Sequence, residues 1–207
     1  YMAMVELIDE QFGRILEALE ETGQTDETLV LFMSDHGEML GDHGIYFKGP
    51  HFYDCAVRVP LVIRWPAGDV RQNLRAEGLV ELLDLAPTFL DAAGLPIPDR
   101  MQGGSLLSVL RGETDSSSIR PHVYSEYYNA WTHKNAYGTM FRTETEKIIV
   151  YHGTEQGELY DLSADPDEFH NLWGDASEKD RKLRLMKACF DASVLSMDSE
   201  PPRRGPF

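Results

Sequence analysis

The sequence has few cysteines, few basic residues and no long hydrophobic run. Its only two cysteines, Cys55 and Cys189, are far apart and form neither a C-x-x-C metal spacing nor a disulfide framework. We expect two free, buried thiols, with a single disulfide as the alternative. No apolar run approaches the roughly 20 residues that cross a bilayer, and the amphipathic opening stretch lacks the basic head and cleavage site of a signal peptide.

Basic residues are outnumbered by acidic ones, 19 Lys and Arg against 35 Asp and Glu, which gives a net charge of −16. Nucleic acid is therefore excluded as an expected partner, because phosphate binding needs clustered Lys and Arg. An anionic substrate would be repelled by the chain as a whole, so any anion site must be locally cationic.

Common catalytic motifs are also missing. The sequence contains no G-x-S-x-G, no P-loop, no H-E-x-x-H and no dinucleotide fingerprint. Cys55 lies in "YDCAVRVP", which runs into a strand-like segment, so we interpret it as a core residue in preference to a nucleophile.

Hydrophobic periodicity predicts an α/β chain. A helix is expected over residues 2–20, with Gly23 near its C-terminus, and a closing helix over 179–195. Continuously apolar runs at 29–34 and 58–65 indicate strands covered on both faces, as in a parallel sheet, and "GLVELLDLAPTFLDAAGLP" indicates a short strand and then a helix capped by Asp84. Four short alternating segments after residue 119 predict a small antiparallel sheet: "HVYSEYY", "GTMFRT", "KIIVY" and "ELYDL".

Three regions follow from this pattern. Residues 1–111 form the first part, 119–197 a small α+β subdomain joined by the polar segment 112–118, and 198–207 a frayed tail. The first part has fewer strand-like runs than the five or more of a usual doubly wound sheet. We therefore expect an incomplete sheet, whose missing strands precede residue 1.

The chemistry gathers directly after the first strand, in "SDHGEMLGDHGIYFKGPH". In open α/β sheets ligands bind at the carboxyl ends of the strands, and Asp35 and His36 sit at that position. A carboxylate beside an imidazole can share one divalent cation, and Gly37 would allow a sharp turn after them. Lys48 is the only Lys or Arg between Arg14 and Arg58 and could hold an anionic oxygen.

Each of these residues also has a structural interpretation. Asp35 and His36 could form only a polar turn with a capping Asp, and Lys48 could be a solvated surface lysine. His43 and His51 are candidates for contact with substrate, or else turn and packing histidines. Further along, "SEYYNAWTH" offers Tyr127, Tyr128, Trp131 and His133 as a pocket wall or as packing between the two parts.

Six longer blocks occur in order from residue 1 to about 173: "YMAMVELIDEQFGRILEALEETG", "TLVLFMSDHGEMLGDHG", "FKGPHFYDCAVRVPLVIRWP", "LVELLDLAPTFLDAAGLP", "MQGGSLLSVLRGE" and "ELYDLSADPDEFHNL". Together they resemble the C-terminal portion of the type I sulfatases of the alkaline phosphatase superfamily. The resemblance implies a partial alkaline-phosphatase-like sheet flanked by helices, followed by a small C-terminal antiparallel sheet with a closing helix.

The resemblance also implies a mechanism. In the family a formylglycine, made from Cys or Ser in a Cys/Ser-x-Pro-x-Arg motif, attacks the sulfate sulfur, and a divalent cation, usually Ca²⁺, binds the nucleophile and the sulfate. Asp35 and His36 match the late pair of metal ligands in the family. Mn²⁺ and Mg²⁺ are other possible ions. Lys48 matches a family lysine that contacts the sulfate. We expect the nucleophile motif and the early acidic pair to be missing from this chain.

The expected activity is that of a sulfuric ester hydrolase acting on an anionic sulfate ester, with sulfated carbohydrate as a family-based expectation and the fragment alone inactive. His36 in place of Asn is shared with choline-sulfatase-like enzymes and phosphonate monoester hydrolases, so a phosphonate or phosphodiester hydrolase is an alternative. A non-catalytic scaffold or binding domain is another. The resemblance implies a periplasmic, extracellular or lysosomal location.

Overall fold

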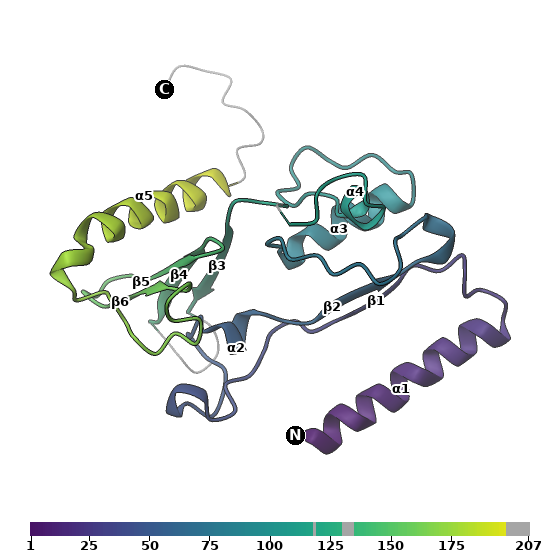
Figure 1. The fold of residues 1–207 in the computed structure, drawn as a ribbon, viewed down its shortest axis with the longest axis horizontal. Coiled ribbons are helices and arrows are strands. Elements are labelled where there is room, and N and C mark those ends of the chain that lie inside the picture. The colour runs from purple at the N-terminus through teal and green to yellow at the C-terminus, as the bar shows by residue number, and fades with distance from the viewer. Residues whose placement is uncertain (118, 130–134, 198–207) are drawn as a thin grey trace.

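The computed structural model describes residues 1–117, 119–129 and 135–197. The expected tail at 198–207, and Trp131 and His133, lie outside the described residues. The structure has a four-stranded sheet and a two-stranded ribbon. Figure 1 shows the larger sheet beneath one long helix, and the ribbon between the N-terminal helix and the region of α3 (Leu85–Ala92) and α4 (Leu107–Leu110). The division of the chain at residues 111 and 119 stays a prediction.

The four-stranded sheet is antiparallel, as expected, and its strands follow chain order. Its strands are β3 (Val123–Tyr128), β4 (Tyr137–Arg142), β5 (Glu146–Tyr151) and β6 (Gly157–Asp161). In the register, Phe141 lies opposite Ile148, and Ile148 lies opposite Leu159. Because neighbouring residues of a strand point to opposite faces, these three share one face, and the residues beside them form the other.

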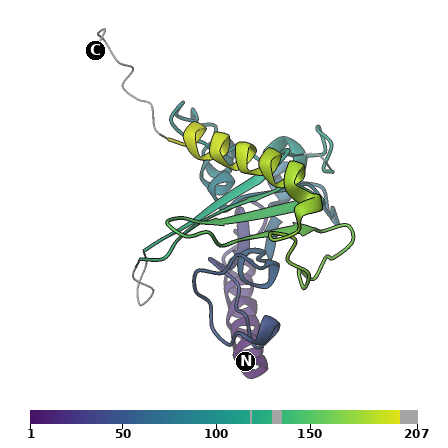
Figure 2. The same cartoon turned by 90° about the vertical axis from the view of Figure 1, so that its left-hand side faces the viewer.

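Helix α5 (Lys179–Leu195) covers the first face, at the bounds that the sequence predicts. Its buried Leu185 and Cys189 pack against Phe141, Ile148 and Leu159. Figure 2 shows α5 on one side of this sheet and the N-terminal helix on the other.

The opposite face of the sheet is covered by the segment around α2 (Asp54–Val57), which the sequence did not predict. The core here joins Phe52 to four residues of the sheet region, and Tyr53 and Val57 pack against it; the four are Met140, Ile149, Tyr160 and Leu162. The C-terminal sheet is thus the middle of three layers. Helix α5 forms the layer on one face, and the segment around α2, which leads to the candidate site, forms the layer on the other.

The two apolar runs of the N-terminal part form strands, β1 (Val30–Met33) and β2 (Leu61–Arg64), but they pair antiparallel, with Val30 opposite Arg64. The prediction that these strands belong to a parallel pairing is wrong for this pair. No residue of β1 or β2 is fully buried, and Val62 is 60% exposed. A continuous apolar run fits any strand whose faces can both be covered, and it carries no information on strand direction.

The short strand expected before residue 85 is a 3-10 turn, η3 (Leu82–Asp84), followed by α3 (Leu85–Ala92). The buried Asp84 carboxylate accepts hydrogen bonds from the N–H groups of Glu81 and Gly104 and pairs with Arg120. Through these bonds the Asp84 side chain holds η3 and the backbone of Gly104 together. The prediction that Asp84 caps α3 is wrong, because its side chain makes no cap hydrogen bond to that helix. Three other short helical segments are η2 (Pro66–Gly68), α4 (Leu107–Leu110) and η4 (Ala176–Glu178).

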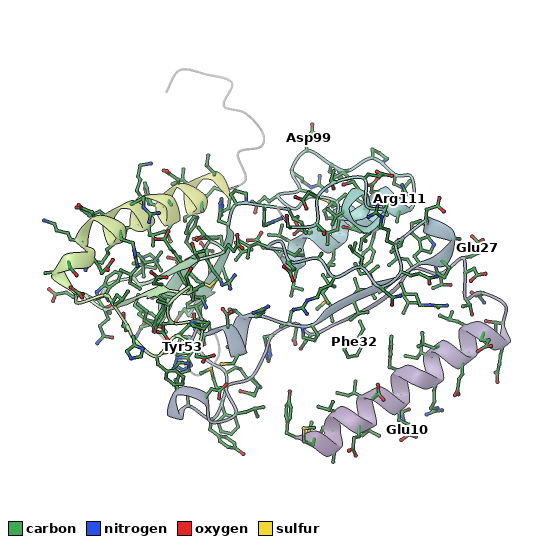
Figure 3. All side chains as sticks on the ribbon, in the orientation of Figure 1. Glu10, Glu27, Phe32, Tyr53, Asp99 and Arg111 are labelled. Atoms are coloured by element: carbon green, nitrogen blue, oxygen red, sulfur yellow. The ribbon has the colours of Figure 1, made fainter. Side chains whose placement is uncertain are left out.

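Helix α1 (Met2–Glu21) is amphipathic, as expected, yet none of its residues is buried. Phe12 meets Phe32 of β1 with ring centroids 5.1 Å apart, and Figure 3 shows Phe32 projecting from β1 toward the helix. Large apolar side chains on the rest of α1, and that of Tyr1 just before it, are exposed; those of the helix are Met2, Met4, Val5, Leu7, Ile8 and Ile15. Within the described ranges, no helix combines the length and apolarity needed to cross a membrane.

A buried ion cluster joins the sheet to α2. Lys147 of β5 has no exposed surface; its Nζ lies 2.8 Å from Asp54 Oδ1 and 2.5 Å from Glu168 Oε1. Burial alone would raise the pKa of Asp54, but the charge and hydrogen bond of Lys147, with Arg142 nearby, hold it below its ordinary value. Burial raises the pKa of Glu168, and Lys147 offsets only part of that rise.

We expect Lys147→Met to lower the free energy of unfolding by about 3–5 kcal/mol, because removing one partner of a buried ion pair leaves uncompensated charge. Arg184→Met is the matched control, since Arg184 pairs with Glu146 of the same strand at the surface; it should cost no more than about 1 kcal/mol. Urea unfolding of the 207-residue chain measures both. A loss below about 1 kcal/mol for Lys147→Met would contradict a structural role for the cluster.

Candidate active site

Asp35 and His36 occupy a tight turn that begins where β1 ends. Ser34 Oγ donates a hydrogen bond to the carbonyl oxygen of His36 at 2.7 Å. The His36 N–H in turn donates to Asp35 Oδ1 at 2.9 Å. These local bonds fix the turn and leave Asp35 Oδ2 free to face outward, with the Asp35 side chain 83% exposed.

The His36 ring is oriented by its own backbone. Nδ1 lies 2.8 Å from the carbonyl oxygen of Gly37, and a carbonyl oxygen can only accept, so Nδ1 carries the proton of the neutral ring. Nε2 then bears the lone pair, and it lies 3.8 Å from Asp35 Oδ2. This is the arrangement by which proteins prepare a histidine to bind a metal ion.

Helix α2 holds the turn through backbone bonds. The N–H of Gly37 donates to Ala56 O at 2.8 Å, and that of Glu38 donates to Cys55 O at 3.1 Å. A Cβ on residue 37 would overlap the Cys55 carbonyl oxygen. The predicted reason for Gly37 was a sharp turn, but Gly37 is not among the residues with positive φ; what requires glycine is the close approach of two backbone segments.

Lys48 reaches the same turn from the other end of the loop. Its Nζ lies 3.5 Å from Glu38 Oε2, so its charge is balanced by a carboxylate three residues after Asp35. Sequence reasoning missed Glu38, although a lone lysine in so acidic a segment was a signal that one of the nearby acids would pair with it.

His43 and His51 lie with Tyr53 and not at the turn. The His43 ring stacks on Tyr53 at 3.8 Å and 11°, and on Phe169 at 4.8 Å. The His51 ring lies 6.5 Å from that of Tyr53. Figure 3 shows Tyr53 below the C-terminal sheet. His43 has φ 53°, in the 3-10 turn η1 (Asp42–Gly44), so the stack holds it in a left-handed conformation. These contacts favour the packing interpretation, and substrate contact stays a prediction.

A hollow of about 350 Å³ opens beside Asp35 and His36. It lies between the turn, the first residues of α1 and the loop that leads to Lys48, and neither His43 nor His51 lines it. Its lining residues are Tyr1, Met4, Ser34, Asp35, His36, Gly37, Glu38, Leu40, Tyr46 and Phe47.

The pair fits a divalent cation in part. Two ligands each about 2.4 Å from one ion can stand up to about 4.8 Å apart, so a 3.8 Å separation of Oδ2 and Nε2 is compatible with shared coordination. Across the part of the chain that the structure describes, however, no group of three or more His, Cys, Asp or Glu side chains could hold a metal. Asp35 and His36 could supply two ligands to a cation, and the described residues do not complete a metal site.

Both cysteines are free thiols, as expected, but only Cys189 is buried; Cys55 is half-buried, so the expectation of a buried core thiol is wrong for Cys55. Burial raises the pKa of Cys55, with Asp42 adding to the effect, and its Sγ lies 3.4 Å from Met39 Sδ. Burial also raises the pKa of Cys189. Both stay protonated at neutral pH, so neither is an activated nucleophile.

The sequence corrects one expectation about the nucleophile. Residues 199–203, Ser-Glu-Pro-Pro-Arg, do have the Ser-x-Pro-x-Arg spacing. They lie outside the described residues and follow the Asp35–His36 pair, whereas the family carries its nucleophile motif in the first half of the protein. The expectation that this spacing is absent from the chain is therefore wrong, although the motif at 199–203 does not have the position that the resemblance implies.

Comparison with known proteins places these features in a family. The family model described as "N-sulphoglucosamine sulphohydrolase, C-terminal" matches residues 41–193. The N-acetylglucosamine-6-O-sulfatase of Bacteroides thetaiotaomicron is 34% identical over 209 residues, which cover 99% of this chain and 37% of that protein.

Two solved structures have the same fold. One, of a protein in complex with its substrate D-glucosamine-2-N,6-O-disulfate, has a TM-score of 0.79 and 32% identity over 99% of this chain and 42% of its own. The other, the phosphonate monoester hydrolase of Agrobacterium radiobacter, has a TM-score of 0.84 and 30% identity over 96% of this chain and 41% of its own.

The chain therefore spans about two fifths of the length of each of these proteins. The region matched by the family model runs from the loop after Asp35 and His36 to the last turn of α5. The expected family and fold class are confirmed: the chain belongs to the sulfatase family, with the alkaline-phosphatase-like fold, and corresponds to a C-terminal portion of such proteins.

Proposed function

We propose that this chain forms one wall of a sulfatase active site, in which a longer parent protein hydrolyses sulfate esters with the help of a divalent cation. Asp35 and His36 are the metal ligands of this wall, and Lys48 contacts the anion. The observation that carries the proposal is the orientation of His36: Nδ1–H is held by the Gly37 carbonyl, and Nε2 faces Asp35 Oδ2 at 3.8 Å.

The chemistry of sulfate transfer explains these residue types. A bound divalent cation supplies positive charge at the transferring group and polarises its oxygens. Lys48 adds a second, compact charge, which is needed because the chain as a whole carries −16. Glu38, 3.5 Å from Lys48, holds the ammonium group near the turn until the anion takes its place. We favour Ca²⁺, with Mn²⁺ or Mg²⁺ as alternatives.

Further polypeptide of the parent is the expected source of the remaining ligands and of the nucleophile. Support comes from the exposed large apolar side chains of the amphipathic helix α1 and from Val62 of β2, since large exposed apolar surfaces mark sites that other polypeptide covers. It also comes from the two-ligand site, and from relatives of which this chain covers about two fifths.

A sulfated glucosamine is the substrate class that we infer. One relative is named N-acetylglucosamine-6-O-sulfatase, and one solved structure contains D-glucosamine-2-N,6-O-disulfate as its substrate. The exposed Tyr46 and Phe47 line the hollow beside Asp35 and His36, and aromatic side chains of this kind offer an apolar surface to a sugar ring.

In the full-length parent, Lys48→Met should lower kcat for a sulfate ester by about 10²–10³, the usual cost of removing one group that stabilises transition-state charge. Lys187→Met is the matched control, because Lys187 pairs with Asp191 on the exposed side of α5, and it should leave kcat unchanged. Equal activity of both variants would remove Lys48 from the site. A full-length parent that hydrolyses no sulfate ester would instead favour a scaffold without catalytic function.

The isolated 207-residue chain should hydrolyse no aryl sulfate and bind Ca²⁺ only weakly, because Asp35 and His36 are two ligands where Ca²⁺ takes 6–8. Isothermal titration with CaCl₂ measures binding, and Asp35→Asn should remove the weak signal. Turnover by the isolated chain that Asp35→Asn abolishes would refute the need for other parts of the parent.

A phosphonate hydrolase is the second candidate function, because a phosphonate monoester hydrolase matches at a TM-score of 0.84. A panel of aryl sulfates and aryl phosphonates, assayed with the full-length parent, separates the two. We expect a higher kcat/KM for the sulfates, and preference for the phosphonates would overturn the sulfate assignment.

A further inference from the structure

Helix α2 connects the buried ion cluster to the turn that carries Asp35 and His36. At its first residue, the Asp54 N–H donates to Glu168 Oε2 at 2.7 Å, and Asp54 Oδ1 accepts from Lys147 Nζ at 2.8 Å. The next two residues, Cys55 and Ala56, offer their carbonyl oxygens to the turn. One helical turn thus touches the cluster on one side and the candidate site on the other.

This helix cannot hold its position by itself. It has four residues, and isolated helices shorter than about 12 residues are marginal in water, so its place is set by tertiary contacts. Phe52 and Val57 give it apolar contacts with the sheet, but apolar packing is not directional. The ion cluster is directional, because each bond joins particular atoms.

Lys147 is the centre of that cluster. In the register it lies opposite Tyr160 on β6 and Arg142 on β4, so its side chain shares the face on which α2 packs. Arg142 also reaches Asp54 Oδ2 at 3.3 Å. The charge of Lys147 allows two carboxylates, from Asp54 and Glu168, to be fixed in one buried place.

We propose that Lys147 is a positioning residue for the Asp35–His36 pair, acting through Asp54, α2 and the backbone bonds to Gly37 and Glu38. The metal-binding part of this inference rests on the proposed function, but the mechanical link does not. The link is made only of bonds described above: Lys147 to Asp54, then Ala56 O to Gly37 N–H, then Gly37 O to His36 Nδ1–H.

The test is NMR spectroscopy of the folded, metal-free 207-residue chain. In Lys147→Met we expect the amides of Gly37 and Glu38 to lose about tenfold or more of their protection from hydrogen exchange, and the His36 ring resonances to shift, while the β4–β5 amides stay ordered. Arg184→Met, which removes a surface ion pair from the same strand, should leave the Gly37, Glu38 and His36 signals unchanged.

A merely structural role gives a different result. Lys147→Met would then lower the urea midpoint while the Gly37, Glu38 and His36 signals of the folded state keep their wild-type values, and that outcome would overturn the proposal. If Lys147→Met does not fold, Asp54→Asn carries the test, since it removes the charge that Lys147 holds and keeps the shape. Unmoved signals in folded Asp54→Asn would overturn the proposal equally.

These signals also separate this inference from the proposed function, because no metal ion, substrate or turnover is involved. A full-length parent without sulfatase activity would refute the function and leave the NMR result standing. Unmoved signals would refute the positioning role and leave the sulfatase assignment standing.

Discussion

The fold of the C-terminal part depends on one buried charge, that of Lys147. A lysine without exposed surface is tolerated only with carboxylate partners, and its partners come from α2 and from the chain after β6. The sheet, Glu168 and the segment beside the candidate site must therefore assemble together. The apolar contacts of Phe52 and Tyr160 fill this layer, but the ion cluster determines which atoms meet.

Local sequence patterns predict the helices and strands of this protein. They do not predict which strands pair or which side chains meet. The bounds of α5 and the four strands of the C-terminal sheet could be predicted, because periods of 3.6 and 2 are local properties. The direction of β2 relative to β1 could not be predicted, since a run of apolar residues gives no information on which way a strand runs. Lys147 begins the block "KIIVY" and looks like a solvated strand end; its partners are 93 and 21 residues away.

The candidate site could be predicted as far as residue types and their order in the chain. Asp35 and His36 stand together because they are adjacent and follow a strand. The partner of Lys48 and the stack of His43 between Tyr53 and Phe169 needed the structure, since both result from how the loop folds back. Asp54 was missed altogether, because a carboxylate at the start of a four-residue helix has no distinctive sequence pattern.

The contact at Gly37 separates the chemistry of the turn from its framework. The bonds that join the turn to α2 use only main-chain atoms of Gly37, Glu38, Cys55 and Ala56. The side chains at 35 and 36 can therefore change during evolution without loss of that connection, whereas a side chain at 37 would break it. Substitutions at 35 and 36 can therefore change the chemistry of the turn, but any residue larger than glycine at 37 would have to push the turn and α2 apart.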